Sequence, residues 1–212
     1  MKFIDIHTHR IPDHDESISI VNRIIGRDEL LPNEVLQSCG IHPWFIEGDG
    51  MQQLERLRTA LSDSSIIALG EAGLDKVVDT SIIIQQTIFE EEVFLSEKTK
   101  KPLLIHCVKA FDELLAIRNR LNPSMPWIIH GFRGKETQAV QLLKKGLYLS
   151  FGEYFHPESL QAAWPAHLFV ETDESKLPIP ILYQRFSESL NIGVEQFAAQ
   201  MENNFRQTFI RI

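Results

Sequence analysis

The chain has 212 residues, of which 43% are hydrophobic and 24% are charged, and 21 Lys and Arg against 29 Asp and Glu give it a net charge of −8. This length provides about one domain, and this composition excludes a disordered chain and a disulfide-rich miniprotein. The negative charge excludes the broad basic surface that gives sequence-independent affinity for nucleic acid, so a phosphate-bearing substrate would need a local binding device.

Eight short apolar runs, rich in Ile, Leu and Val, recur along the chain and predict strands. Most of the runs are continuous rather than alternating, as expected of parallel strands that are covered on both faces. The predicted strands are 3–6, 18–21, 35–41, 66–69, 103–105, 127–129, 147–151 and 168–170.

Helical periodicity occupies the stretches between and after the later strands. Gly146 is predicted to end the helix over 135–145. The acidic run Glu90, Glu91 and Glu92 is predicted to form a solvated face of the helix over 82–98. The predicted helices are 51–61, 82–98, 110–121, 135–145, 179–190 and 194–209.

The alternation of strands and helices predicts an α/β fold, a (β/α)8 TIM barrel formed by a single domain over residues 1–212. Residues 11–17, between the first two strands, are too few for a crossover helix, and the next link contains Gly26 and Pro32. We therefore expect a shortened barrel whose first crossover helices are reduced or missing.

The two cysteines, Cys39 and Cys107, form no CxxC pair, which favours a reducing, cytoplasmic compartment. The N-terminus has no apolar leader and no run of about 18 apolar residues occurs, so we expect neither export nor a membrane span. Cys107 follows His106, and neighbours on a strand point to opposite faces. Cys107 is therefore predicted to be a buried strand residue rather than a nucleophile.

A His-x-His motif, His7 and His9, follows the first predicted strand. Alternate residues of an extended chain point the same way, so both imidazoles can reach one metal ion. Surface or supporting histidines are an equally open interpretation of the motif alone. Its position at the carboxyl end of a strand favours function, because parallel barrels carry their active sites at that end.

Polar side chains follow four more predicted strands at the same end. Glu71 follows the fourth strand, His106 the fifth, His130 the sixth and Asp173 the eighth. Each alone has an ordinary structural interpretation, as a helix-capping acid or a hydrogen-bonded core histidine. Together with the His-x-His motif, they predict a metal site.

These four imidazoles and two carboxylates form a nitrogen and oxygen donor set that suits Zn²⁺ or Mn²⁺, with Mg²⁺ or Ni²⁺ as alternatives. Six ligands exceed the needs of one open catalytic ion, so we expect two divalent metal ions, with Glu71 as a candidate bridge. Such a pair would lower the pKa of a bound water and stabilise charge on a phosphoryl or carbonyl oxygen, which indicates hydrolysis.

The order and spacing of these motifs resemble the TatD family of metal-dependent deoxyribonucleases, within the amidohydrolase-like superfamily of TIM-barrel hydrolases. The resemblance extends over nearly the whole chain. Its landmarks are Asp5-x-His7-x-His9, Gly40-Ile41-His42-Pro43, Gly70-Glu71-Ala72-Gly73-Leu74-Asp75, Ile105-His106, His130-Gly131-Phe132-Arg133-Gly134, Glu171-Thr172-Asp173 and the tail Asn204-Phe205-Arg206-Gln207-Thr208-Phe209.

The resemblance implies how the ligands divide between two ions. His7 and His9 would hold the first ion, and Glu71 would bridge to the second. His106 and His130 would hold the second ion. Glu71 is therefore expected to act both as a ligand and as part of the catalytic machinery.

The resemblance also implies roles on the substrate side. Asp173 would be both a ligand and the base that orients the attacking water. His42 would face the pocket and contact a phosphate or the leaving group, with a turn histidine before Pro43 as the alternative. Trp44 and Phe45 follow it and are candidates for a platform on which a base stacks.

Several positions depart from the family pattern around the substrate. Val108 stands where the family usually carries an Arg, and the adjacent Lys109 is a candidate substitute. Arg133 adds a positive charge after the sixth strand, with an ordinary exposed Arg as the alternative. Glu174 and Lys76 replace the usual Ser and aromatic residue. The metal ligands are complete, whereas the expected substrate contacts are altered.

The sequence as a whole predicts a metal-dependent hydrolase of ester bonds, and the resemblance makes it a deoxyribonuclease that takes a DNA strand end. One alternative is a hydrolase of a small phosphoester, amide or lactone, favoured by Val108, Glu174 and the net charge. A second alternative is a non-catalytic metal-binding barrel, against which the complete ligand set argues. We expect no membrane partner and no obligate protein partner.

Overall fold

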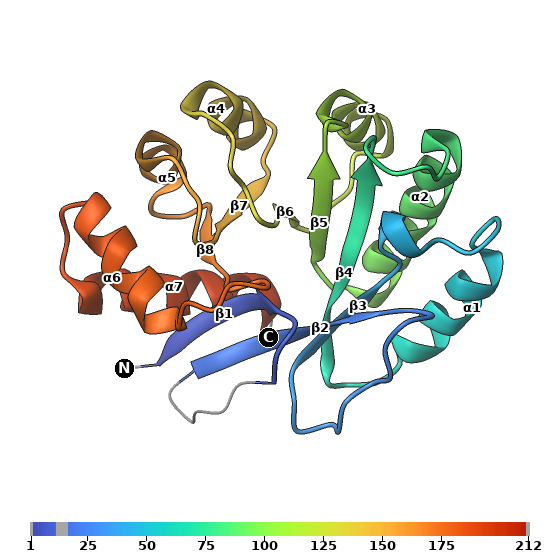
Figure 1. Cartoon of the computed structure of the whole chain (residues 1–212), viewed down its shortest axis with the longest axis horizontal. Helices are drawn as coiled ribbons and strands as arrows, with labels where there is room; N and C mark the ends of the chain where they lie inside the picture. Colours follow the sequence, from blue (N-terminus) through green and yellow to red (C-terminus); the bar gives the residue numbers. More distant parts are fainter. Residues whose placement is uncertain (1, 12–16, 211–212) are drawn as a thin grey trace. The chain divides into compact units, whose positions relative to one another are not determined.

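The computed structural model describes residues 2–11 and 17–210, and in this part of the chain eight strands form one sheet in chain order (Figure 1). Neighbouring strands are hydrogen-bonded to each other in the parallel direction. All eight predicted strands are confirmed, and β1, β4 and β5 continue beyond their apolar runs into the polar motifs. The strands are β1 Phe3–Thr8, β2 Ser17–Ile24, β3 Gln37–Gly40, β4 Ile66–Asp75, β5 Leu103–Val108, β6 Trp127–Ile129, β7 Tyr148–Phe151 and β8 Leu168–Val170.

At least one helix follows each strand from β3 onward. The six predicted helices are confirmed to within one residue at each end. Gly146 lies just beyond α4 with a φ of 73°, a left-handed conformation that fits its predicted role in ending that helix. The short helix α5 and the 3-10 helix η1, Pro43–Phe45, were not predicted. The α-helices are α1 Met51–Ala60, α2 Ile82–Thr99, α3 Phe111–Leu121, α4 Glu136–Lys144, α5 Pro157–Ala163, α6 Ile179–Ser189 and α7 Val194–Phe209.

Parallel strands that follow one another in chain order and alternate with helices define the (β/α)8 barrel class, so the predicted fold is confirmed. The link between β2 and β3 contains no helix, as expected from Gly26 and Pro32. The link between β1 and β2 includes residues 12–16, which lie outside the described residues. The expectation for that first crossover therefore stays a prediction.

The described chain divides into two compact units. Unit 1 combines residues 1–21 with 128–212, and unit 2 spans residues 22–127. Unit 1 holds β1, β7 and β8 with helices α4 to α7, whereas unit 2 holds β3, β4 and β5 with helices α1 to α3. The single domain expected over 1–212 stays a prediction.

In unit 1, all six residues of β1 are buried. Tyr183 on α6 fixes this strand, because its hydroxyl accepts from the Ile4 N–H at 2.7 Å and donates to the Ile4 carbonyl at 3.0 Å. The Tyr183 ring also packs edge-on against Phe3, with 5.0 Å between ring centroids. Tyr183 therefore holds β1, which leads into the His-x-His motif, by both polar and apolar contacts.

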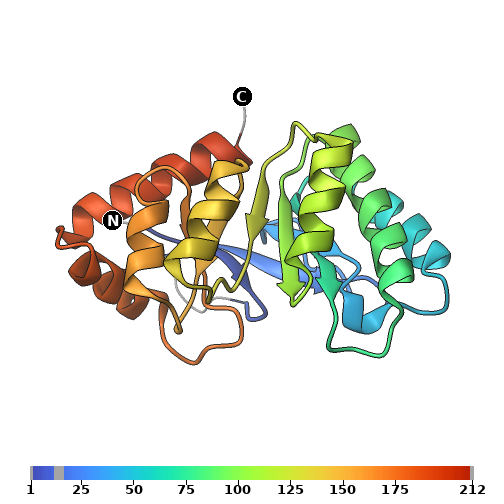
Figure 2. The same ribbon diagram turned by 90° about the horizontal axis from the view of Figure 1, so that it is seen from above.

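On the outside of unit 1, α4 and α5 run side by side (Figure 2).

Strands β1 and β8 are neighbours within unit 1. Thr8 forms a parallel bridge with Asp173, and the Asp173 N–H donates to the His7 carbonyl at 2.9 Å. This backbone bond brings the residue after β8 to the end of β1, where the two motif histidines lie.

In unit 2, glycines let β4 lie unusually close to its neighbours. Gly73 has a φ of 143°, and a Cβ there would collide with the carbonyl oxygen of His106 on β5. A Cβ on Gly40 of β3 would come within 2.7 Å of the Gly70 Cα on β4. Gly73, the last residue of the Gly-Glu-Ala-Gly motif, and Gly40 are therefore required by the close packing of β4 against β5 and β3.

The prediction that residues 90–92 form a solvated helix face is wrong for Glu92. Glu92 on α2 is completely buried, and its Oε1 accepts from the Ile41 N–H at 2.7 Å. Burial raises the pKa of Glu92 well above its ordinary value, although the bond from Ile41 opposes the shift. Within the described residues its Oε2 has no hydrogen-bond partner. The Glu92 carboxyl group therefore ties α2 to the residue before His42.

We expect Glu92→Gln to keep the contact with Ile41 and to remove a pH dependence of stability. The folded protein keeps a proton that the unfolded chain releases above its ordinary pKa of about 4.3, so wild-type stability falls as the pH rises from there toward the raised pKa. Denaturant unfolding of both proteins between roughly pH 5 and pH 8 tests this, and the variant should gain on the wild type as the pH rises. Glu91→Gln, on the exposed side of α2, is the control, and a pH-independent difference for Glu92→Gln would contradict the prediction.

Neither cysteine is suited to nucleophilic chemistry. Cys39 is buried, Cys107 is half-buried within β5, and burial raises the pKa of each thiol to about 12. Cys107 is less buried than predicted. Its raised pKa keeps the thiol protonated at neutral pH, which makes it a poor nucleophile.

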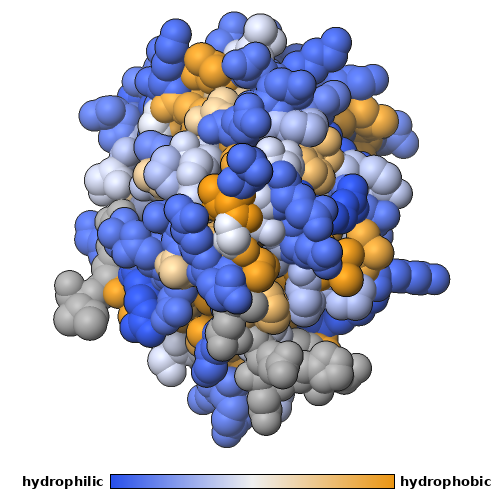
Figure 3. Space-filling view, turned by 90° about the vertical axis from the view of Figure 1, so that its left-hand side faces the viewer, coloured by the Kyte–Doolittle hydropathy of each residue, from blue (hydrophilic) through white to orange (hydrophobic). Residues whose placement is uncertain are grey.

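No helix among the described residues is long and apolar enough to cross a bilayer. The face that lies to the left in Figure 1, over α6, is mainly hydrophilic, and its apolar residues are scattered (Figure 3). Such scattered apolar residues are ordinary on a protein surface.

Candidate metal centre

The first group of ligand-type side chains in unit 1 lies where β1 and β8 end. His7 is the fifth residue of β1, and His9 follows the strand on the same side. The Oδ1 atom of Asp173 lies 3.7 Å from the Nε2 atom of His7 and 3.5 Å from the Nε2 atom of His9. His7 is fully buried, whereas the side chain of His9 is 28% exposed. The structure therefore brings together the three residues that sequence reasoning assigned to the ends of these two strands.

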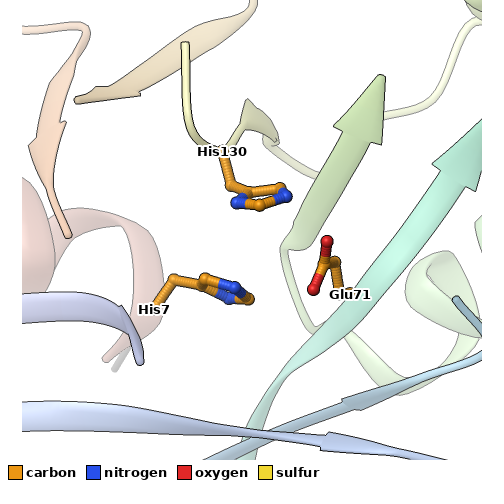
Figure 4. A group of neighbouring side chains, drawn as sticks. All are labelled: His7, Glu71 and His130. Atoms are coloured by element: carbon orange, nitrogen blue, oxygen red, sulfur yellow. The ribbon is translucent and has the colours of Figure 1, made fainter. Parts of the chain in front are cut away.

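A second group in unit 1 surrounds His130, which follows β6. Its ring centroid lies 4.4 Å from that of His7 (Figure 4), and its Nδ1 lies 3.2 Å from Oε1 of Glu171. The same Glu171 oxygen accepts from the Gly131 N–H at 2.7 Å. Burial opposes ionisation of Glu171, but the charges of His130 and His7 outweigh it and lower its pKa. Glu171 is therefore a carboxylate that orients the His130 ring.

Asp5 fixes the chain segment that carries Asp173. Its two carboxyl oxygens accept from Thr172, from the N–H at 3.1 Å and from the hydroxyl at 2.6 Å. Burial raises the pKa of Asp5 to about 7, although these bonds oppose the shift. Asp173 itself has a φ of 51°, a left-handed conformation that Asp and Asn adopt more readily than most residues.

The third group lies in unit 2 and is centred on Glu71, which projects from β4 (Figure 4). Its Oε1 lies 3.0 Å from Nε2 of His42 and 2.9 Å from Nδ1 of His106. Asn22 orients it from β2, because its amide donates to Oε2 at 3.3 Å and its carbonyl oxygen accepts the Glu71 N–H at 2.8 Å. One carboxylate thus joins histidines from the ends of two different strands.

Asp75 adds a second carboxylate beside His106. Its Oδ2 lies 3.0 Å from Nε2 of His106 and accepts from the indole N–H of Trp44 at 2.6 Å. Burial opposes ionisation of Asp75, but the bonds from Trp44 and His106 outweigh it and lower its pKa. The Trp44 side chain is 56% exposed, so Asp75 fixes the ring at one edge and leaves much of it open to solvent.

His42 lies in one group with Glu71 and His106, two of the predicted ligands, whereas the sequence predicts for it only a contact with substrate. Its Nδ1 accepts from the Trp44 N–H at 3.1 Å, which leaves Nε2 to face Glu71. Lys109, directly after β5, is exposed. Arg133 is exposed too, and its guanidinium lies 5.3 Å from the centroid of the Tyr154 ring. The roles of these three residues toward substrate stay predictions.

The donor chemistry of these groups fits a divalent metal ion. Within each group, one nitrogen or oxygen atom from every residue lies within 4.8 Å of the others, a spacing that one ion can span. Imidazole nitrogen and carboxylate oxygen suit Zn²⁺ and Mn²⁺. The groups are His7, His9 and Asp173; His130, Glu171 and Asp173; and His42, Glu71 and His106.

Three carboxylates of the site were not assigned by sequence reasoning, although each belongs to a quoted motif. Glu171 lies two positions before Asp173, and both belong to the group around His130. Asp5 and His7 are two residues apart on β1, so alternation along the strand places both on one side. Asp75 is four residues beyond Glu71 on the same strand and follows the same alternation.

A cavity in unit 1 opens beside Asp173. It has a volume of about 450 Å³, and its lining includes Glu171, Asp173, Arg133 and Tyr154. A cavity of this volume is in the range of small-ligand sites. We call it the Asp173 cavity.

Comparison with known proteins agrees with these features. The model of the family described as TatD related DNase matches residues 8–210. The uncharacterized metal-dependent hydrolase YcfH of Escherichia coli (strain K12) is 27% identical over 199 residues, which cover 84% of this chain and 74% of that protein. The 3'-5' ssDNA/RNA exonuclease TatD of Cronobacter sakazakii is 28% identical over 146 residues, which cover 64% of this chain and 56% of that protein.

Among solved structures, that of YjjV, a TatD homolog from Escherichia coli K12, is similar with a TM-score of 0.82 at 21% sequence identity. The similarity covers 99% of this chain and 98% of that chain, and it shows that the fold is shared. The family model spans nearly the whole chain, and relatives across that span are metal-dependent hydrolases. The chain therefore belongs to the TatD family of metal-dependent hydrolases.

Proposed function

We propose that this protein hydrolyses phosphodiester bonds of single-stranded nucleic acid with two divalent metal ions. The observation that carries the proposal is the set of imidazole and carboxylate groups that follow the strands of a parallel barrel. The carboxyl ends of such strands share one face of the barrel, which supports a common centre. The proposed ligands are His7, His9, Glu71, His106, His130 and Asp173.

The proposed division of ligands is the one that the family resemblance implies. His7 and His9 would hold one ion, together with Asp173, which lies beside them. His106 and His130 would hold the other ion, with Glu71 as the bridge. Glu71 suits a bridge because Asn22 orients one of its oxygens. When bound, divalent ions polarise a phosphoryl oxygen and lower the pKa of water.

Asp173 is the proposed general base. It accepts a proton from the attacking water as the water oxygen adds to phosphorus and the bond from phosphorus to the leaving oxygen breaks. The left-handed backbone at Asp173 and the bond from its N–H to His7 hold the carboxylate in place. General base catalysis of this kind contributes about a hundredfold to ten thousandfold to turnover.

The substrate class rests on the relative that is named a single-stranded DNA and RNA exonuclease, and on side chains of this chain. Arg133 supplies a positive charge at the Asp173 cavity, and Lys109 follows the strand of His106. Trp44 offers an exposed ring that Asp75 orients for stacking against a base. His42 is proposed to contact the phosphate or the leaving group.

The test is degradation of single-stranded DNA by purified protein with Mn²⁺, Mg²⁺, Zn²⁺ or Ni²⁺. We expect the wild type to degrade the strand with at least one of these ions and His130→Ala to lose the activity by about a hundredfold or more. His167→Ala is the matched control, because His167 lies in the same unit, packs against Tyr148 and belongs to none of the candidate metal groups. Equal activity of His130→Ala and wild type would contradict the proposal.

The confined Asp173 cavity favours one second candidate, a hydrolase of small phosphoesters. That function predicts hydrolysis of bis(p-nitrophenyl) phosphate without degradation of the strand. Metal analysis that finds no ion, together with no turnover of either substrate, would instead indicate a non-catalytic barrel.

A further inference from the structure

A second cavity in unit 1 adjoins the Asp173 cavity. It has a volume of about 230 Å³ and shares Arg133, Glu153 and Tyr154 with its larger neighbour. We call it the side cavity. Its complete lining is Arg133, Glu153, Tyr154, Phe155, His156 and Arg185.

The balance of charge changes between the two cavities. The Asp173 cavity carries the carboxylates of Glu153, Glu171, Asp173 and Glu174 against the cations of Arg133 and Lys176. In the side cavity, Arg133 and Arg185 oppose the single carboxylate of Glu153. That carboxylate already accepts the Ser175 hydroxyl at 2.6 Å. One cavity therefore suits metal cations, and its neighbour suits an anion.

Aromatic rings hold both guanidinium groups of the side cavity. Arg185 lies over the Phe155 ring at 5.6 Å, and Phe155 packs edge-on at 4.7 Å against the buried ring of Phe186. Arg133 lies 5.3 Å from the centroid of the Tyr154 ring. Arg185 is thereby connected to the core of unit 1, and stacking of this kind orients a guanidinium for bidentate contact with a phosphate.

Tyr154 adds a surface for a base. Its side chain is 63% exposed, and it lines both cavities. Exposed aromatic rings beside a cationic groove are the usual means by which proteins bind single strands without sequence preference.

We propose that the side cavity binds the nucleotide next to the scissile phosphate, so that the preferred substrate is a single strand rather than a small phosphoester. Arg133 and Arg185 bind its phosphate, and Tyr154 stacks on its base. The proposal rests on the proposed phosphodiesterase function and adds a direction of entry to it, because the strand would reach the Asp173 cavity from the side of Arg185.

The first test compares kcat/KM for a thymidine dinucleotide and a thymidine tetranucleotide. We expect the wild type to prefer the tetranucleotide, and Arg185→Ala and Tyr154→Ala each to reduce that preference by about tenfold, mainly through KM. Tyr154→Phe keeps the ring and should keep the preference. Arg206→Ala removes an exposed cation on α7 that pairs with Glu202 and is the charge-matched control. An unchanged preference in Arg185→Ala and Tyr154→Ala would overturn the proposal.

The second test measures binding of a fluorescein-labelled oligothymidylate by anisotropy with Mn²⁺, in the Asp173→Asn background so that the strand stays intact. We expect Arg185→Ala to weaken binding by about tenfold and to lower the salt dependence of binding by about one counterion. Binding equal to that of the Arg206→Ala control would overturn the side cavity as a subsite. Failure of the wild type to cleave any phosphodiester would overturn the proposed function, and the anisotropy result would still decide whether the side cavity binds a strand.

Discussion

Asp173→Asn is expected to lower the turnover of single-stranded DNA by about a hundredfold to ten thousandfold while at least one metal ion stays bound. The amide cannot take a proton from water at neutral pH. It does keep the size of the carboxyl group and an oxygen that can face His7 and His9, whose Nε2 atoms lie 3.7 Å and 3.5 Å from Oδ1 of Asp173. Asn also tolerates the φ of 51° at this position, so the backbone is expected to be preserved.

The measurement combines single-turnover rates with metal analysis of the same preparation. Glu158→Gln, which neutralises an exposed carboxylate of α5 in the same unit, controls for the change of charge. Near-wild-type turnover of Asp173→Asn would exclude Asp173 as the base. Loss of turnover with loss of all metal would instead make Asp173 a ligand only.

Glu71→Gln is expected to reduce metal content itself, with affinity for the ion lowered by more than about a hundredfold and activity lost in parallel. A carboxylate that bridges two cations contributes a full negative charge to both, and an amide contributes none. The variant should still fold, because Gln keeps the size of the side chain and its amide oxygen can still accept the bond from the Asn22 amide.

Metal titration by calorimetry, with thermal unfolding of the metal-free protein alongside, checks this expectation. Glu91→Gln is the matched control, since Glu91 lies on α2 of the same unit and pairs with Arg58 at the surface. Metal affinity equal to that of the control would contradict a ligand role for Glu71. Lower affinity that is accompanied by unfolding of the metal-free variant would indicate a structural role.

Most of the fold could be predicted because each strand is a run of apolar residues and each long helix has a clear period. Helix α5 was missed because Pro157–Ala163 has seven residues, too few for periodicity to be detected. The prediction for Glu92 is wrong because it treats the three acidic residues as one exposed helix face. The spacing of Glu92 indicates otherwise, since Ile88, Glu92 and Ser96 are four residues apart and all are buried on one face of α2.

The residues proposed as ligands could be located from their place after predicted strands, but the contacts that support them could not. Asn22 lies far from Glu71 in sequence, and nothing in its surroundings marks it as a partner. The contact of Trp44 with Asp75 depends on the 3-10 helix η1, whose three residues carry no periodic signal. Such contacts depend on the packing of segments that are distant along the chain, which local patterns do not report.

The division of the ligand groups between the units has a consequence for the order in which the protein can fold during synthesis. Unit 2 is one continuous segment, so His42, Glu71 and His106 are all available once residue 127 has been made. Unit 1 combines residues 1–21 with residues 128–212, so the group of His7, His9 and Asp173 cannot form until Asp173 has been made. The His-x-His motif, which is made first, is therefore completed last, and until β8 emerges its two imidazoles lack the carboxylate that lies beside them in the folded protein.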